Sequence, residues 1–355
     1  MDRAKNSGSR TLCVRLEDLR ERMIEDGVGA LAVTSEGNAE YLFDVGVRGL
    51  FLVTQSSVES LVSGFHRYEF ENSELDPRFY STRSEAQEAA EELLADRDVV
   101  HADSESRLLG SVEAEETSLV ERMRRRKSDG EVESIREACD LTAEAISRVS
   151  QELFSGETEL ELRTRLNRFY AEHGVDEAFL DDGGMSLVQT SCMRPHRSPS
   201  DVSPGSEDMV IVDSGCVVDG YRSDVTRTFC LESSAEQRQL FDDVLEIQSA
   251  LAEMAEPGVD ASDLHKRLLA EVEERGYDPE KHVLYPPGHG VGVRIHEAPS
   301  LSLGSESELK AGDVITLEPG LHVPGVGGCR VEDVYRVGRG VQRLSDLGRR
   351  LDPTG

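Results

Sequence analysis

The chain has 355 residues, of which 37% are apolar, and no apolar run approaches the roughly 20 residues of a membrane-spanning helix. That length suits two domains rather than a single core. Asp and Glu number 70 against 39 Lys and Arg, so the formal net charge is −31. A surface of this sign repels nucleic acid and anionic membranes, and we expect neither as a partner.

The acidic residues are spread along the chain, and only five of the basic residues are lysines. Salt relieves the self-repulsion of such a surface, because it shortens the Debye length to about 3 Å at 1 M. We therefore predict a halophilic protein from a salt-rich cytoplasm, with an ordinary acidic protein as the alternative. Residues 1–10 are polar and no apolar segment follows them, which predicts a disordered tail and no secretory signal.

The cysteines show no CxxC spacing, and three of them sit in apolar strand-like runs, where a thiol behaves as a small hydrophobe. We predict that all six are reduced and structural, and form neither a zinc cluster nor a disulfide framework. They are Cys13, Cys139, Cys192, Cys216, Cys230 and Cys329.

The N-terminal third alternates helix and strand patterns. Residues 15–26 place four apolar side chains on one helical face, and Gly27 is a suitable stop. These side chains are Leu16, Leu19, Met23 and Ile24. Strand patterns follow at 30–34, 50–54 and 60–64, then a helical pattern at 84–95 and a short apolar run at 98–102. Together they predict a mixed α/β domain whose residues suggest no chemistry of their own.

A basic run at 124–127 precedes a capping-box pattern, in which Ser128 and Glu131 open a long helix. We place the domain boundary there, with an N-terminal domain at 11–127 and a C-terminal domain at 128–355. The C-terminal domain shows the order helix, helix, hairpin twice, a repeat of pattern and not of sequence. Helices are predicted near 130–153, 158–173, 235–255 and 261–275, and hairpins near 209–230 and 313–335.

The first hairpin carries two acidic residues in a suggestive arrangement. An apolar strand run ends abruptly at Asp213, and the Asp-Gly pair at 219–220 is a strong two-residue turn signal. With that turn, Asp213 lies opposite Thr226. Asp224 then lies opposite Gly215, on the same face as Asp213 and about 7–8 Å from it between Cα atoms. Two carboxylates at that range can hold metal ions about 3.5–4 Å apart, although two acids on a solvated face remain the alternative.

The second hairpin repeats this device. Glu318 interrupts an apolar strand at 314–323, and Glu332 lies in the returning strand at 329–337. Upstream, glycines flank His289 in the segment GHGVG and allow close backbone approach. An isolated histidine is more often structural, but its position after a paired-carboxylate hairpin favours the interpretation of His289 as a metal ligand. Four carboxylates and one imidazole would thus reach one location.

These motifs resemble the metal-dependent aminopeptidases and prolidases of the pita-bread fold, in particular the Xaa-Pro aminopeptidase and prolidase branch. The resemblance rests on VDSG, SDVTRT, GHGVG, LEPG and RVED, which hold Asp213, Asp224, His289, Glu318 and Glu332 in the family's order. Residues 15–43 resemble, more loosely, the family's creatinase-like domain. The resemblance implies an α+β fold, with a C-terminal pita-bread domain and a smaller N-terminal α/β creatinase-like domain.

The resemblance also implies two divalent metal ions. Carboxylate and imidazole ligands suit Mn²⁺, our first expectation, and also Co²⁺, Fe²⁺ or Zn²⁺. By analogy with the family, Asp213 would bind one ion, and His289 and Glu318 would bind the other. Asp224 and Glu332 would bind both, and the two ions together would lower the pKa of water for its attack on the substrate.

The implied reaction is hydrolysis of the N-terminal peptide bond of a short peptide, by a cytoplasmic homodimer. Glu318 would carry a proton to the leaving amine, and His196 and His296 would hydrogen-bond the carbonyl oxygen and the tetrahedral intermediate. Arg330 would orient the carboxylates, with a surface strand arginine as the alternative. A silent binding protein of the same fold also stays open, although such relatives typically lose ligand carboxylates and this chain has lost none.

Two positions of the substrate pocket depart from the prolidase pattern. Tyr285 stands where a histidine is usual, and His322 stands where a tyrosine is usual. If the two side chains face each other, their hydrogen bond survives the exchange and a preference for proline is retained. If they do not meet, the protein is an aminopeptidase without that preference.

Overall fold

The computed structural model describes residues 5–354 apart from residues 72, 96–99, 105, 111, 180–184, 191–193 and 195–196, and describes side chains from residue 14 onward. The chain divides into two compact units, Met1–Arg124 and Arg125–Gly355. The boundary that we expect after residue 127 lies beside this division.

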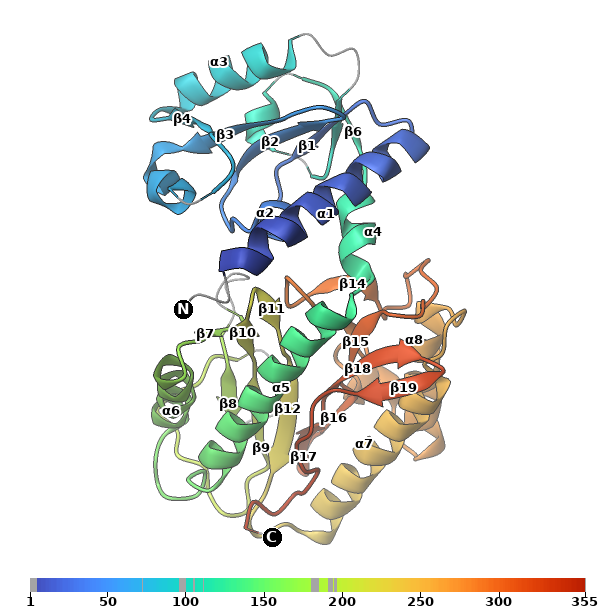
Figure 1. The fold of residues 1–355 in the computed structure, drawn as a ribbon. Coiled ribbons are helices and arrows are strands. Elements are labelled where there is room, and N and C mark those ends of the chain that lie inside the picture. The colour runs from blue at the N-terminus through green and yellow to red at the C-terminus, as the bar shows by residue number, and fades with distance from the viewer. Residues whose placement is uncertain are drawn as a thin grey trace. The chain divides into compact units, whose positions relative to one another are not determined.

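The first unit is built on a six-stranded mixed sheet with the strand order β4-β3-β2-β1-β5-β6 (Figure 1). Its strands are β1 (Ala30–Val33), β2 (Gly49–Thr54), β3 (Val58–Ser63), β4 (Arg78–Tyr80), β5 (Val100–Ala102) and β6 (Ala114–Glu116). Its helices are α1 (Lys5–Glu25), α2 (Glu36–Phe43), α3 (Arg83–Leu94) and α4 (Leu119–Arg125), with short 3₁₀ turns at Gly64–Phe70 and Arg107–Leu109. The predicted α/β character is therefore present, and every residue of β1 and β2 is buried.

Helix α1 departs from the sequence prediction at both of its ends. It begins at Lys5, so residues 5–10 are helical where we expected a disordered tail. Leu19 and Met23 are fully buried as predicted, but Ile24 is 68% exposed. The apolar stripe is thus narrower than the sequence indicates, because residues 23 and 24 are neighbours in the chain and point about 100° apart around the helix.

The second unit repeats two helices and a hairpin, as predicted. The first repeat contains α5 (Asp129–Ser150), α6 (Glu159–Glu172), β7 (Asp176–Glu177), β8 (Leu187–Gln189), β9 (Val210–Ser214), β10 (Cys216–Val218), β11 (Tyr221–Arg222) and β12 (Val225–Phe229). The second contains α7 (Ala235–Met254), α8 (Ala261–Glu274), α9 (Pro279–His282), β13 (His289–Gly290), β14 (Glu297–Ser300), β15 (Val314–Leu317), β16 (Gly320–Val323), β17 (Gly327–Arg330), β18 (Asp333–Gly338) and β19 (Gly340–Arg343). Capping boxes open α5, α6 and α7, so hydrogen bonds of Ser128, Thr158 and Ser234 mark where these helices begin.

Each repeat has its own apolar core. Leu162, Leu166 and Tyr170 of α6 pack with α5 and with β9 and β12, while α7 and α8 pack against β15 to β18. Four cysteines contribute to these cores or lie beside them, and all four are buried and outside any disulfide. They are Cys139, Cys216, Cys230 and Cys329. Cys13 and Cys192 lie outside the residues whose side chains are described.

The first hairpin has the predicted register with an interruption in it. Asp213 pairs with Thr226 and Ser214 with Val225, and the same register resumes between Val217 and Arg222 after two residues on each strand. The turn has positive φ at both central residues, 49° at Asp219 and 80° at Gly220, as a type I′ turn requires. Asp224 lies in the interruption, opposite Gly215, as the register predicts.

The strands can kink at this point because Gly215 has no side chain. A Cβ atom there would lie 2.0 Å from the Ser223 carbonyl oxygen, so only glycine allows the approach. On one side of the kink, β9 and β12 form a sheet with β8. On the other side, toward the turn, β10 and β11 form a separate sheet with β7. The interruption frees the Asp224 backbone from the ladder and turns this residue toward the second hairpin.

The second hairpin has the same plan. Leu317 pairs with Asp333, the ladder stops for two residues on each strand, and it resumes between Gly320 and Arg330 in the same register. Glu318 and Glu332 lie in this interruption. A backbone bridge between Thr226 and Glu332 joins the two hairpins, with a 3.0 Å hydrogen bond from the Glu332 N–H to the Thr226 carbonyl.

Candidate metal centre

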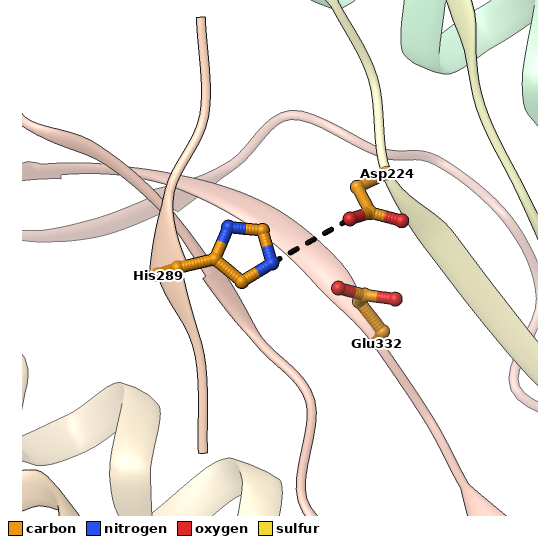
Figure 2. Close-up of side chains that lie close together, drawn as sticks. All are labelled: Asp224, His289 and Glu332. Atoms are coloured by element: carbon orange, nitrogen blue, oxygen red, sulfur yellow. Dashed lines mark ion pairs between the residues drawn. The ribbon is translucent and has the colours of Figure 1, made fainter. Parts of the chain in front are cut away.

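The interruptions of the two hairpins bring acidic side chains together around His289. Ligand atoms of Asp224, His289 and Glu332 lie within 4.8 Å of one another (Figure 2). The His289 Nε2 atom is 3.6 Å from a carboxylate oxygen of Asp224 and 3.4 Å from one of Glu318. Asp213, opposite Thr226, completes the set of five residues that the sequence motifs single out.

The cluster concentrates negative charge in a buried place. Asp213, Asp224 and Glu332 are each less than 8% exposed, and Glu318 is only partly exposed. Burial, together with the carboxylates of Glu332 and Asp213, raises the pKa of Asp224 well above its usual range. Burial and Glu332 raise the pKa of Glu318 in the same way, and burial and Asp213 raise the pKa of Glu332 to about 7. The carboxylates therefore need either protons or a cation to be accommodated.

His289 is neutral, as a candidate nitrogen ligand has to be. Its Nδ1 atom lies 3.1 Å from the Gly290 carbonyl oxygen, so Nδ1 carries the hydrogen and Nε2 presents a lone pair to the carboxylates. Burial and the neighbouring His296 ring lower the pKa of His289 to about 3. The ring is therefore uncharged at neutral pH, as a metal ligand must be.

Three carboxylate oxygens of the cluster are buried and have no hydrogen-bond partner. They belong to Asp213, Asp224 and Glu332. A buried carboxylate oxygen without a partner is rare in a folded protein unless it coordinates a cation. Oxygen and imidazole nitrogen donors are those preferred by Mn²⁺, Fe²⁺, Co²⁺ and Zn²⁺, so the residues present fit a divalent metal centre.

Arg330 lies inside this centre and not on the surface of its strand. Its guanidinium forms a buried ion pair with Asp213, and its Nε donates to the Thr226 hydroxyl at 3.1 Å. That hydroxyl in turn donates to Glu332 at 2.7 Å. Arg330 thus reaches a carboxylate of each hairpin, one directly and one through Thr226, and its Cζ also lies 5.4 Å from the centre of the Tyr285 ring.

The two exchanged pocket residues meet. The Nε2 of His322 lies 3.2 Å from the Tyr285 hydroxyl, and the rings stand edge to face with centroids 5.6 Å apart. His322 is fully buried, whereas Tyr285 is partly exposed. The hydrogen bond that the paired exchange would retain is therefore present in the structure.

The structure describes one of the two histidines expected on the substrate side. His296 is exposed, and its ring centroid lies 4.3 Å from that of His289. It therefore lies beside His289 and is accessible to solvent. His196 lies outside the described residues.

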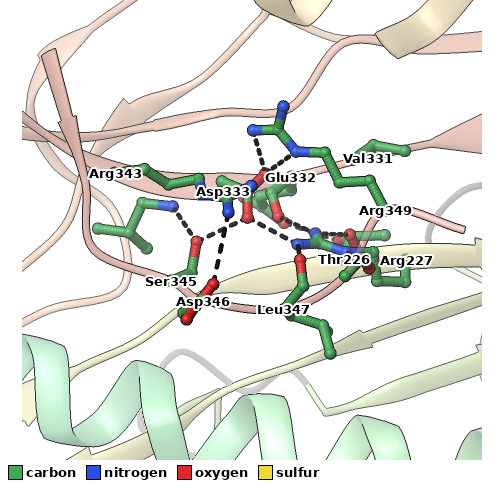
Figure 3. Close-up of polar contacts among 12 residues, drawn as sticks. Thr226, Arg227, Val331, Glu332, Asp333, Arg343, Ser345, Asp346, Leu347 and Arg349 are labelled. Carbon is green, nitrogen blue, oxygen red and sulfur yellow. Dashed lines mark hydrogen bonds and ion pairs between the residues drawn. The ribbon is translucent and has the colours of Figure 1, made fainter.

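Sequence reasoning missed a buried polar network around the backbone of Glu332 (Figure 3). Arg227 and Asp333 are fully buried and form an ion pair of 2.7 Å. Arg227 also donates to the carbonyl oxygens of Glu332 and Leu347, while Arg349 and Ser345 donate to Asp333. The signal was available, since Asp333 directly follows Glu332 and Arg227 directly follows Thr226, the residue that pairs with Asp213.

This network fixes the backbone on which Glu332 is mounted. The Arg227 guanidinium holds the Glu332 carbonyl at 2.7 Å, and the Gln248 amide donates to the Val331 carbonyl at 3.1 Å. A candidate ligand whose flanking carbonyls are held in this way has little freedom to turn away.

Among the described residues we find no helix whose length and apolarity would let it cross a bilayer.

Comparison with known proteins agrees with this geometry. Over 227 residues the chain is 34% identical to the Xaa-Pro dipeptidase of Pyrococcus furiosus, a match that covers 63% of this chain and 64% of that protein, slightly less than two thirds of its length. The fold is similar to that of the prolidase from Pyrococcus horikoshii OT3, with a TM-score of 0.83 at 26% identity over 95% of this chain and 99% of that one. The X-Pro aminopeptidase from Thermotoga maritima MSB8 has the same fold, with a TM-score of 0.84 at 23% identity over 95% of this chain and 99% of that one.

These structures confirm the two-domain α+β pita-bread fold that the sequence motifs imply. A family model also matches residues 133–339, which contain both hairpins and all five candidate ligands. Because that match covers more than half of the chain, the protein belongs to metallopeptidase family M24.

Proposed function

We propose that this protein is a peptidase that uses two divalent metal ions to hydrolyse the N-terminal peptide bond of short peptides, with a preference for Xaa-Pro substrates. The observation that carries the proposal is the set of three buried carboxylate oxygens without hydrogen-bond partners, gathered around a neutral imidazole. The names of the relatives, Xaa-Pro dipeptidase and prolidase, support the same reaction.

The proposed ligand roles are those that the family resemblance implies, and the positions of the residues are compatible with them. Asp224 and Glu332, whose ligand atoms lie within 4.8 Å of each other and of His289, would each serve both ions. His289 and Glu318, whose atoms are 3.4 Å apart, would complete one site. Asp213 would complete the other, using the oxygen that Arg330 leaves free. Mn²⁺ is our first expectation for the metal.

When bound, the two cations would polarise the scissile carbonyl and lower the pKa of water. Glu318, the partly exposed carboxylate of the set, would accept a proton and return it to the leaving amine. His296 would donate a hydrogen bond to the carbonyl oxygen as it gains negative charge. We propose the same role for His196.

The hydrogen bond between Tyr285 and His322 supports a pocket that still prefers proline. Proline specificity requires a pocket of fixed shape, and His322 is fully buried where it meets Tyr285. The exchange swaps the positions of the imidazole and the phenol but keeps both groups, so the polarity of the pocket wall is retained.

The resemblance also leads us to propose a homodimer, which light scattering on the purified protein would test.

The function is tested by assay of metal-depleted protein with and without added Mn²⁺. The substrates are a dipeptide and a longer peptide, each with and without proline in the second position. We expect hydrolysis that depends on metal and is faster for the proline substrates. Equal rates for substrates with and without proline would indicate an aminopeptidase without proline preference. Stoichiometric metal binding without any hydrolysis would indicate a binding protein.

The pocket is tested by a double-mutant cycle with Tyr285→His, His322→Tyr and the two together, read as kcat/KM on an Xaa-Pro dipeptide. If the residues act as a pair, the double variant recovers well beyond the sum of the single losses. Additive losses would show that the contact contributes nothing to specificity.

A further inference from the structure

Lys127 is buried in an unusual setting. Lysine is almost never fully buried unless it is paired, yet the Lys127 side chain is 1% exposed and its ammonium lies 3.0 Å from Glu297, which is 4% exposed. The chain has only five lysines. Lys127 ends the basic run at 124–127 that marks the predicted domain boundary, and it is not one of the candidate metal ligands.

Glu297 closes the turn that carries His296. One of its oxygens accepts a hydrogen bond from the Arg294 N–H at 2.8 Å, while the other receives the Lys127 ammonium. The Gly292 N–H donates to the Arg294 carbonyl at 3.1 Å within the same turn. Because Glu297 directly follows His296, fixing this carboxylate fixes the backbone from which the His296 ring projects toward His289.

Gly292, the last glycine of GHGVG, leaves room for this ion pair. A Cβ atom at this position would lie 2.8 Å from the Glu297 carboxylate and 2.8 Å from Cε of Lys127. Both neighbours are buried and held by other contacts, so neither can move aside without breaking the pair. The GHGVG motif therefore leaves space for the ion pair of Lys127 and Glu297, in addition to carrying His289.

Lys127 is itself held on a rigid support. Its N–H donates to the Gly312 carbonyl at 3.4 Å, and Arg125 makes a two-pronged contact with the buried Asp313, at 2.9 and 2.7 Å. Both partners lie in the turn that leads into β15, the strand that ends just before Glu318. The segment before α5 is thus attached to the strand that leads to one candidate ligand and, through Glu297, to the turn that bears His296.

We propose that Lys127 is a positioning residue of the active site, which acts through Glu297 to hold His296 where it can donate to the substrate carbonyl. The inference rests on the role proposed above for His296. Lys127 is not one of the candidate metal ligands, and its ammonium is paired with Glu297. Its loss should therefore lower turnover without changing metal content.

The test compares Lys127→Met, His296→Ala and the two combined, by kcat and KM on an Xaa-Pro dipeptide and by metal content. A single oxyanion donor contributes about 10²- to 10³-fold to kcat, and its misplacement costs part of that. We expect Lys127→Met to lower kcat by about 10- to 100-fold with unchanged metal content. In the His296→Ala background the same substitution should lower kcat by less than about threefold, because the residue through which it acts is already gone.

The matched control is Lys281→Met, since Lys281 is exposed and pairs with Asp278 on the surface, and it should leave kcat unchanged. If Lys127→Met does not fold, as judged by near-ultraviolet circular dichroism, Glu297→Gln tests the same contact with an isosteric side chain. Equal losses in both backgrounds, or a wild-type kcat in the folded variant, would overturn the inference and leave the proposed function intact. No hydrolysis by the wild type would instead remove the proposed function.

Discussion

The two hairpins of the second unit are alike in construction. In each, the paired register stops for two residues on both strands and then resumes unchanged toward the turn. Asp224 and Glu332 occupy equivalent places, because each is the second of the two interrupting residues on the returning strand. This equivalence supports the proposal that these two residues have the same role toward both metal ions.

The hairpins differ in where the second candidate ligand lies. In the second hairpin it is Glu318, directly across the interruption from Glu332. In the first hairpin the equivalent place is Gly215, and the carboxylate has moved back by two residues to Asp213, where Arg330 pairs with it. The same backbone device therefore carries one carboxylate that is ion-paired with Arg330 and another that lies beside the neutral His289 ring.

Replacing the equivalent residues should have the largest effect. Asp224→Ala and Glu332→Ala should each remove both ions and lower kcat/KM by far more than the roughly 100-fold loss typical of changes to outer-shell partners, because each residue would bind both ions. Metal analysis and kinetics measure the result. Glu113→Ala, an exposed acid of the first unit, is the control. Full turnover of Asp224→Ala with added Mn²⁺ would show that the ligand assignment is wrong.

The second prediction concerns the network in which Arg227 of the first hairpin is paired with Asp333 of the second hairpin. Asp333→Ala leaves the fully buried Arg227 without its carboxylate, and we expect it to lower the free energy of unfolding by about 3–5 kcal/mol. Asp129→Ala removes an exposed partner of Arg336 on the same strand, and should lower it by less than about 1 kcal/mol. Urea unfolding separates the two cases. Similar small losses would mean that the network does not stabilise this hairpin.

The third prediction concerns the stability of the metal-free protein as the pH changes. The pKa of Glu332 is raised from 4.5 to about 7, so the folded protein holds a proton there that the unfolded chain has lost. This contribution is fully present below about pH 4.5 and is lost as the pH rises to about 7. The melting temperature of the metal-free protein should therefore fall over this window, and fall less in Glu332→Gln. Bound Mn²⁺ should reverse the trend, because it favours the ionised carboxylates.

The smallest expected effect is that of salt on stability, and it does not distinguish the two hairpins. A net charge of −31 implies self-repulsion that salt screens, so the melting temperature should rise by a few degrees between about 0.1 M and about 1 M KCl. A melting temperature that stays flat or falls over this range would remove the halophilic interpretation, and the peptidase assignment would stand.

Local chemistry made much of the second unit predictable. The Asp-Gly turn at 219–220 sets the register of the first hairpin, and the register sets which residues face one another, because side chains alternate along a strand. The capping residues likewise mark where α5 begins, at Ser128 and Glu131. The acids that interrupt apolar strands identify Asp213 and Glu318, since a carboxylate in such a place needs a partner. Each of these signals lies within a few residues of the feature that it predicts.

The sequence by itself therefore determined the order of the elements, the first hairpin's register and the identity of the candidate ligands. Only the tertiary structure decided which charges are paired behind them: Arg330 with Asp213, Arg227 with Asp333 and Lys127 with Glu297. These partners are 117, 106 and 170 residues apart in the chain. With 70 acidic residues available, no local pattern selects one carboxylate for a given cation, because the choice depends on which strands and turns the folded backbone brings together.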